Sequence, residues 1–320
     1  MSIQVGNALG LSQSIFFVLY WVYSVICKMI HKIENDYLSI SIHSKGAELH
    51  SIVSKENQHE YLWNGDAKVW NRRSPILFPI VGRLVDNKYK YDGKEYSMSQ
   101  HGFARDSFFE ELFSSKTEIT FILTESDYTL LQYPFQFVLF VTYKLEDKKI
   151  KVEYEVKNTN EKSAMYYSIG AHPGFVLHDE TNSSIEDYLI EFANEEELKF
   201  HLLNGPYRTG EIKSFANISK TLKLDKETFK NDALIFNSLK SNSLILKNLK
   251  SKRALNFRWK NFSWMGIWSK YKTEKFICIE PWAGVCDLEG DVKLLTEKEA
   301  IENLNPKTSK TYEFEIEILN

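Results

Sequence analysis

The chain has few cysteines and lacks the glycine-rich loops that bind nucleotide phosphates. Its 320 residues include three cysteines, Cys27, Cys278 and Cys286, which are too few for a disulfide framework and lack metal-site spacing. We therefore expect a reducing compartment and a cytoplasmic location. Neither G-x-G-x-x-G after a strand nor G-x-x-x-x-G-K-[ST] occurs, which disfavours dinucleotide and nucleoside triphosphate folds.

The chain also lacks an excess of one charge, a repeat and a linker. It carries 40 basic and 43 acidic side chains, so no basic face for a nucleic-acid partner is indicated. No fixed-period repeat, no Pro-rich or Gly/Ser-rich linker and no composition break follow residue 33. Because 43% of the residues are hydrophobic, a packed core is expected. Residues 29–320 are predicted to form one domain, as a monomer or a homodimer.

The first 28 residues form a hydrophobic extension with two open interpretations. Residues 15–27 (IFFVLYWVYSVIC) are almost continuously apolar, but a membrane-spanning helix needs about 20 such residues. No Lys or Arg precedes the run and no cleavage site follows, so a secretory signal peptide is disfavoured. The extension is either a weak membrane anchor, which would leave the domain in the cytoplasm because Lys28 and Lys32 follow it, or irrelevant to the domain. Membrane association is expected only through residues 15–27.

Alternating apolar and polar residues dominate the rest of the chain. Short runs with period 2 occur at 37–44, 118–125, 137–158 and 311–320. The segment 137–158 predicts an antiparallel hairpin, since two alternating runs flank a charged turn. The sequence thus predicts an all-β fold, a large antiparallel β-sandwich with few short helices, completed by a C-terminal strand. The best helix candidate is the Glu-rich segment 296–304 (TEKEAIENL).

Three segments place ionisable groups beside Gly, Pro or Trp. The first, from SPILFPIVGRL to SQHGFARD, contains Arg83, His101 and Arg105, which suit hydroxyl or anionic oxygens. Salt bridges at loop ends explain these residues equally well. The second, YSIGAHPGF, holds His172 between small residues and a proline, where a stiff loop would direct the imidazole toward a cleft. An isolated His is more often a structural group at a strand end.

The third segment, KFICIEPWAGVCD, contains Glu280. Strand alternation places this carboxylate on the same side as Phe276 and Cys278, where it is costly unless paired or used. Trp282 follows, and aromatic rings stack on the C–H faces of sugars. The alternative is an edge-strand glutamate in water. The remaining histidines lack H-x-H or H-E-x-x-H spacing, so no metal site is predicted, and no G-x-S-x-G elbow supports covalent catalysis.

In combination, PILFPIVGRL, HGFARD, GAHPGF and CIEPWAGVCD resemble the aldose 1-epimerase (galactose mutarotase-like) family, with greatest likeness to its LacX-like branch. The resemblance runs from about Ile33 to the C-terminus. It implies a β-sandwich with the sugar in an open groove, no cofactor, and an isomerase that interconverts α and β anomers.

By the same resemblance, Glu280 matches the catalytic base and His172 matches the acid that protonates the ring oxygen. His101 and Arg83 match positions that bind substrate hydroxyls, and Asp232, in NDALIF, resembles a sugar-binding aspartate. Trp282 and Arg105 complete the expected substrate-binding set. An acid and a base of this kind predict a bell-shaped pH profile.

The substrate stays open between an aldohexose and a hexose phosphate. PIVGR replaces an Asn-containing turn of the better-known galactose mutarotases, so galactose specificity is not carried over. Arginines at 72, 73, 83 and 105 are suited to a phosphate. Two other classes stay open: a non-catalytic carbohydrate-binding protein, and a glycosidase or lyase that would need a second acid such as Asp232 or Asp287.

Overall fold

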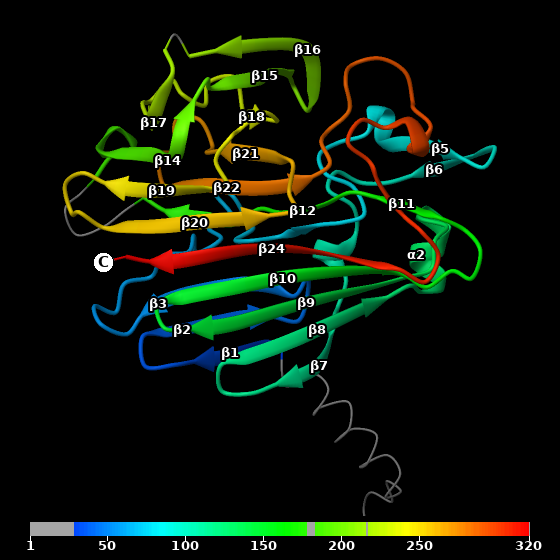
Figure 1. Ribbon diagram of the computed structural model, residues 1–320, viewed down its shortest axis with the longest axis horizontal. Coiled ribbons are helices and arrows are strands. Elements are labelled where there is room, and N and C mark those ends of the chain that lie inside the picture. The colour runs from blue at the N-terminus through cyan, green and yellow to red at the C-terminus, as the bar shows by residue number, and fades with distance from the viewer. Residues whose placement is uncertain (1–28, 178–182, 216, 320) are drawn as a thin grey trace, which may run out of the picture.

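Antiparallel β-strands make up most of the structure, a computed structural model that describes residues 29–177, 183–215 and 217–319 (Figure 1). This architecture confirms the predicted all-β sandwich. The expectation of an anchor in residues 1–28 lies outside the described residues. In the part of the chain that is described, no helix is both long and apolar enough to span a membrane.

Two large sheets dominate the fold. In spatial order, the nine-stranded sheet consists of β17 (Ser219–Lys223), β14 (Tyr188–Glu196), β19 (Ser243–Asn248), β20 (Ala254–Lys260), β24 (Ser309–Ile318), β10 (Lys149–Asn158), β9 (Phe137–Glu146), β8 (Glu118–Thr124) and β7 (Glu110–Ser114). The eight-stranded sheet consists of β16 (Tyr207–Ser214), β15 (Lys199–Asn204), β18 (Leu234–Phe236), β21 (Trp264–Trp268), β22 (Phe276–Ala283), β12 (Ile169–Ala171) and β4 (Ile76–Leu77), with β13 (Gly174–Val176) also paired to β22.

Smaller elements surround these sheets. The minor sheets are β1 (Ile30–Glu34), β2 (Leu38–His43) and β3 (Glu48–Ser54); β5 (Lys88–Tyr91) and β6 (Lys94–Ser97); and β11 (Met165–Tyr167) and β23 (Glu302–Leu304). The helices of the described residues are the α-helix α2 (Asp127–Gln132) and the 3₁₀ turns η1 (Val85–Asn87), η2 (Ala104–Asp106), η3 (Ile185–Asp187) and η4 (Leu295–Glu297).

The segments with period-2 alternation form half-buried strands, as predicted. In the β9–β10 hairpin, Glu146 pairs with Lys149 across the turn, and every second side chain of both strands is buried. These apolar side chains enter a core that also contains Ile277 and Ile279 of β22. The alternate residues of β22, among them Cys278 and Glu280, point to the opposite face of the eight-stranded sheet. That face carries the candidate site.

The segment 296–304 is not the helix that its composition suggested. It contains only the end of η4, then a turn at Ala300 with a φ of 57°, then the short strand β23. Tertiary contacts override its helix propensity, because Leu295 and Lys298 are both buried and β23 pairs with β11.

The C-terminal strand lies inside the nine-stranded sheet rather than at its edge. β24 pairs with β20 on one side and with β10 on the other, and its side chains at 312, 314, 316 and 318 are at most 3% exposed (Figure 1). Ending the chain at residue 308 would leave two unpaired strand edges and open the core. We expect this truncation to abolish soluble, cooperatively unfolding protein in circular dichroism melts. Removing only residues 319–320 serves as the control, and a wild-type melt of the shorter chain would contradict the prediction.

Candidate active site

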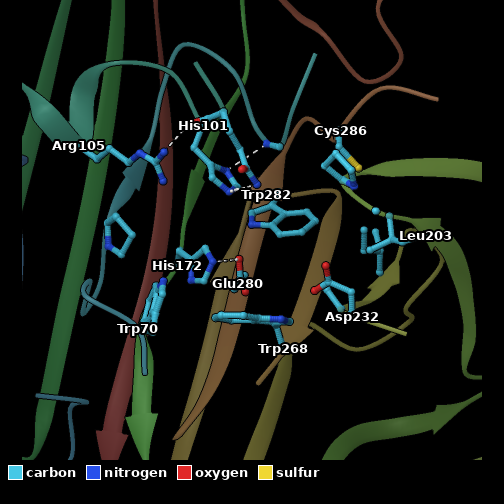
Figure 2. A pocket seen from close by; sticks show the side chains of 17 residues that line it. Trp70, His101, Arg105, His172, Leu203, Asp232, Trp268, Glu280, Trp282 and Cys286 are labelled. Carbon is cyan, nitrogen blue, oxygen red and sulfur yellow. Dashed lines mark hydrogen bonds and ion pairs between the residues drawn. The ribbon is translucent and has the colours of Figure 1, made fainter. Parts of the chain in front are cut away.

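A cavity of about 250 Å³ opens on the outer face of the eight-stranded sheet (Figure 2). Three indoles line it, those of Trp70, Trp268 and Trp282. Polar side chains also line it: Gln100, His101, Arg105, His172, Asp232 and Glu280. Apolar walls with a few convergent polar groups are typical of small-molecule sites.

His172 and Glu280 contact each other on the wall of this cavity. The Nε2 atom of His172 lies 3.1 Å from Oε2 of Glu280, and the two residues are 8% and 2% exposed. Sequence reasoning predicted a role for each but did not give the distance between them. The structure brings them into hydrogen-bonding distance, where a proton can pass between them.

Neighbouring strands fix the position of Glu280. It lies in β22 opposite Gly266 of β21, and in the view of Figure 2 its carboxylate lies between the indoles of Trp268 and Trp282. A Cβ on Gly266 would lie 2.5 Å from Cζ2 of Trp282, so only glycine lets this indole cross β21. Cys278 lies two residues earlier on the same side of β22 and is completely buried.

Aromatic contacts hold His172 between β12 and β13. Its ring stacks on Trp70, with centroids 4.9 Å apart and an interplanar angle of 27°. Trp268 meets the same ring edge-on at 5.7 Å. Pro173 follows directly, and β13 then pairs with β22, so the imidazole is fixed from both ends.

Burial shifts both partners toward their neutral forms. Desolvation lowers the pKa of His172 to about 3, since no solvent stabilises the imidazolium. Desolvation, followed by the nearby charge of Asp232, raises the pKa of Glu280 well above its usual value. The two groups together therefore hold a single proton over a wide pH range.

Asp232 lies across the cavity from His172 in Figure 2. It precedes β18 with a φ of 73°, a left-handed conformation that aspartate tolerates better than most residues. Burial raises its pKa, an effect that a backbone hydrogen bond at Ala233 and a side-chain hydrogen bond with Trp268 oppose. Its carboxylate is thus a polar group available to a ligand on this side.

His101 and Arg105 line another wall. The backbone N–H of Gly82 donates to Nδ1 of His101 at 3.1 Å, so the neutral ring carries its proton on Nε2, an atom that lies 3.3 Å from the side-chain amide nitrogen of Gln100. Gly82 has a φ of 73°, and a Cβ there would lie 2.3 Å from Cβ of Cys286. Glycine is therefore required where these two cavity loops touch.

The remaining arginines of the predicted cluster lie mostly outside the cavity. Arg83 does not line it; its Nη2 donates to Oε1 of Gln100 at 3.2 Å, so it acts on the cavity through that amide. Arg72 binds Asp106 at 2.8 Å, and Arg73 donates to the backbone carbonyl of His50. Arg105 lines the cavity while its Nη2 donates to the carbonyl of Gln100 at 2.6 Å.

Sequence reasoning missed Trp70, Trp268 and Gln100 as cavity residues. Trp268 had a detectable signal, because Trp264, Gly266 and Trp268 alternate along β21 and share the face of Glu280. Trp70 lies in a loop, where no periodicity marks its direction. Asp287, offered as a second acid, pairs with Lys298 at 2.7 Å and does not line the cavity.

Comparisons with known proteins agree with this fold and site. The family model for aldose 1-epimerase matches residues 29–288. The plasmid-encoded protein LacX of Lactococcus lactis subsp. lactis is 32% identical over 304 residues, which cover 91% of this chain and all of that protein.

Solved structures give the same result. The galactose mutarotase related enzyme from Lactobacillus acidophilus is 31% identical with a TM-score of 0.87, covering 91% of this chain and 98% of that one. A galactose mutarotase-like protein from Lactobacillus casei is 29% identical with a TM-score of 0.85, covering 91% and 100%. The resemblance found in the sequence motifs is confirmed: the chain belongs to the aldose 1-epimerase family and is LacX-like.

Proposed function

We propose that residues 29–320 form one catalytic unit that interconverts the α and β anomers of an aldose, with Glu280 as general base and His172 as general acid. The contact between these two side chains carries the proposal. The anomeric and ring oxygens of a sugar are bonded to the same carbon. A base for one oxygen and an acid for the other must therefore lie close together, as these groups do.

The reaction moves only protons and one C–O bond. With the shared proton transferred to His172, the ionised Glu280 takes the proton of the anomeric hydroxyl while His172 protonates the ring oxygen, and the bond between that oxygen and the anomeric carbon breaks. Rotation of the resulting aldehyde exposes its other face. The ring then closes as His172 recovers its proton and Glu280 returns the other to the new hydroxyl. No electron carrier is needed for these steps.

The other cavity residues would bind the sugar. Trp268 and Trp282 offer flat apolar faces for its C–H groups. Asp232 accepts from hydroxyls, while His101 and Arg105 donate to hydroxyl oxygens. Arg83 contributes by orienting Gln100.

An unphosphorylated aldose fits this site better than a hexose phosphate. Arg105 is the only one of the four clustered arginines that lines the cavity, and the acidic Asp232 shares the cavity with it. A phosphate is normally held by several converging cationic donors.

The test is a mutarotation assay of the full chain, followed by polarimetry. Freshly dissolved α-glucose, α-galactose and glucose 6-phosphate are compared, with residues 29–320 assayed in parallel. We expect acceleration for a free hexose above that for the phosphate. Sugar binding without acceleration would favour the carbohydrate-binding alternative, and release of sugar from a glycoside would favour a glycosidase.

The buried acid–base pair predicts a broad pH optimum. The pair is active with one proton. At low pH a second proton binds to His172, whose pKa is lowered to about 3. At high pH the last proton dissociates from Glu280, whose pKa is raised. The acidic limb of the pH profile therefore moves to lower pH and the basic limb to higher pH, so kcat/KM should be flat across neutral pH. A midpoint near 6.5, the ordinary histidine value, in a kcat/KM profile would contradict this prediction.

A further inference from the structure

A third potential ligand lies beside the acid–base pair. One ring nitrogen of His172, the sulfur of Cys278 and one carboxylate oxygen of Glu280 all lie within 4.8 Å of one another. It is the one group of three or more such residues found among the described residues. We propose that these three side chains form a binding site for a zinc-type divalent cation, and that the cation inhibits the enzyme.

The spacing suits a tetrahedral cation. Zinc bonds of about 2.0 Å to nitrogen and oxygen and about 2.3 Å to sulfur place nitrogen and oxygen about 3.3 Å apart, and sulfur about 3.5 Å from either. The observed distance from Nε2 of His172 to Oε2 of Glu280 is 3.1 Å. The sulfur of Cys278 lies within 4.8 Å of the other two ligand atoms, so it must move toward them by no more than about 1.3 Å to reach the zinc spacing.

The backbone holds two of the three ligands on one strand and the third in the short link between β12 and β13. Cys278 and Glu280 occupy alternate positions of β22 and so face the same side of the sheet. Gly174, two residues after His172, pairs directly with Cys278. Ligands on rigid strands keep their geometry better than ligands on loops.

The fourth coordination position would face the cavity. His172 and Glu280 line it, whereas Cys278 is fully buried and does not. A cation held by these three groups would keep its open position for water or a sugar hydroxyl. Three protein ligands with one open position is the usual arrangement of accessible zinc sites.

The donor set selects the type of cation. A thiolate and an imidazole favour Zn²⁺ and related metals, whereas Mg²⁺ and Ca²⁺ prefer oxygen ligands. Binding replaces the thiol proton of Cys278, which is released to solvent. This site revises the expectation from the sequence, in which Cys278 had no partner at metal-ligand spacing.

Inhibition follows because the cation would occupy the lone pairs that the reaction needs. Glu280 could not take a proton while it binds the metal, nor could His172 carry one. This consequence rests on the proposed function, but metal binding itself does not. Zn²⁺ should therefore lower kcat for mutarotation, and a chelator should restore the rate.

The experiment titrates the metal-free full chain with Zn²⁺ by calorimetry and with Co²⁺ by absorption spectroscopy. We expect one metal per chain and a thiolate-to-cobalt charge-transfer band. Cys278→Ser should remove the band and weaken Zn²⁺ binding at least about tenfold. Cys286→Ser and Cys27→Ser, which remove the other two thiols, should retain both signals. Mg²⁺ and Ca²⁺ should neither bind nor inhibit.

Several outcomes would overturn the site. A wild-type cobalt spectrum without the charge-transfer band would overturn the site. This test needs no variant, so it holds even if Cys278→Ser does not fold. Loss of the band in Cys286→Ser would assign the metal to Cys286, the cysteine that lines the cavity. Metal binding with these properties in a protein that does not accelerate mutarotation would support the site and reject the proposed function.

Discussion

Replacing Glu280 with glutamine should lower kcat/KM for mutarotation by about 10²–10⁴-fold, the usual contribution of a positioned acid or base. Glutamine keeps the size of the side chain but cannot take the proton of the anomeric hydroxyl. The same loss is expected for His172→Asn. The rate is measured by polarimetry on variants whose thermal melts match the wild type.

Two comparisons make this prediction specific. Glu313→Gln removes a carboxylate that pairs with Lys151 on the nine-stranded sheet, whose strands contribute no residue to the cavity lining, and should leave the rate unchanged. The double variant of Glu280 and His172 should lose little more than either single variant, because the two groups act as one unit. A Glu280→Gln enzyme within threefold of the wild-type rate would exclude this carboxylate as the base.

Replacing Lys298 with methionine should lower the free energy of unfolding by about 3–5 kcal/mol, since it leaves a charge buried without its partner. The ammonium of Lys298 donates to Oδ1 of Asp287 at 2.7 Å, and the two side chains are 3% and 4% exposed. The second oxygen, Oδ2, accepts from the backbone N–H of Val85 at 3.0 Å. Urea denaturation measures the effect.

A matched surface pair is the control. Lys148 and Glu56 also lie 2.7 Å apart, but their side chains are 38% and 68% exposed. Lys148→Met should therefore cost less than about 1 kcal/mol. Adding Asp287→Asn to Lys298→Met should recover part of the loss, because the uncompensated charge is gone while an acceptor for Val85 remains. Equal stability losses at the two lysines would show that burial does not set the effect.

The ion pair of Lys298 and Asp287 also supports one wall of the cavity. Lys298 donates to the carbonyl of Val285, and the backbone N–H of Asp287 donates to the carbonyl of Arg83 at 3.0 Å. Cys286, between these residues, lines the cavity. Loss of the ion pair should thus raise KM more than it lowers kcat, because it loosens a wall of the cavity and leaves His172 and Glu280 in place.

Strand alternation could be interpreted from the sequence because it is local. Half-buried strands such as β9, β10 and β24 must place apolar residues at every second position, and this pattern survives without knowledge of any partner strand. The motifs around His172 and Glu280 could be recognised for the same reason. Each lies within a few consecutive residues, with small or rigid neighbours that limit its backbone.

Long-range contacts could not be predicted from the sequence. Nothing in 296–304 shows that Lys298 would find a buried carboxylate, so its helix propensity misled the prediction. The place of β24 between β20 and β10 depends on hydrogen bonds to strands up to about half the chain away. Trp70 reaches the site from a loop with no periodic signal.

By itself, the sequence determined the all-β class, the alternating strands and the two ionisable groups that the proposed reaction uses. Only the tertiary structure decided that His172 and Glu280 touch, that Trp70 and Trp268 pack against His172, and that the sulfur of Cys278 lies within 4.8 Å of a ligand atom of each. The physical reason is that alternation follows from each residue's own burial, whereas distances between side chains far apart in the chain follow from how the strands pair.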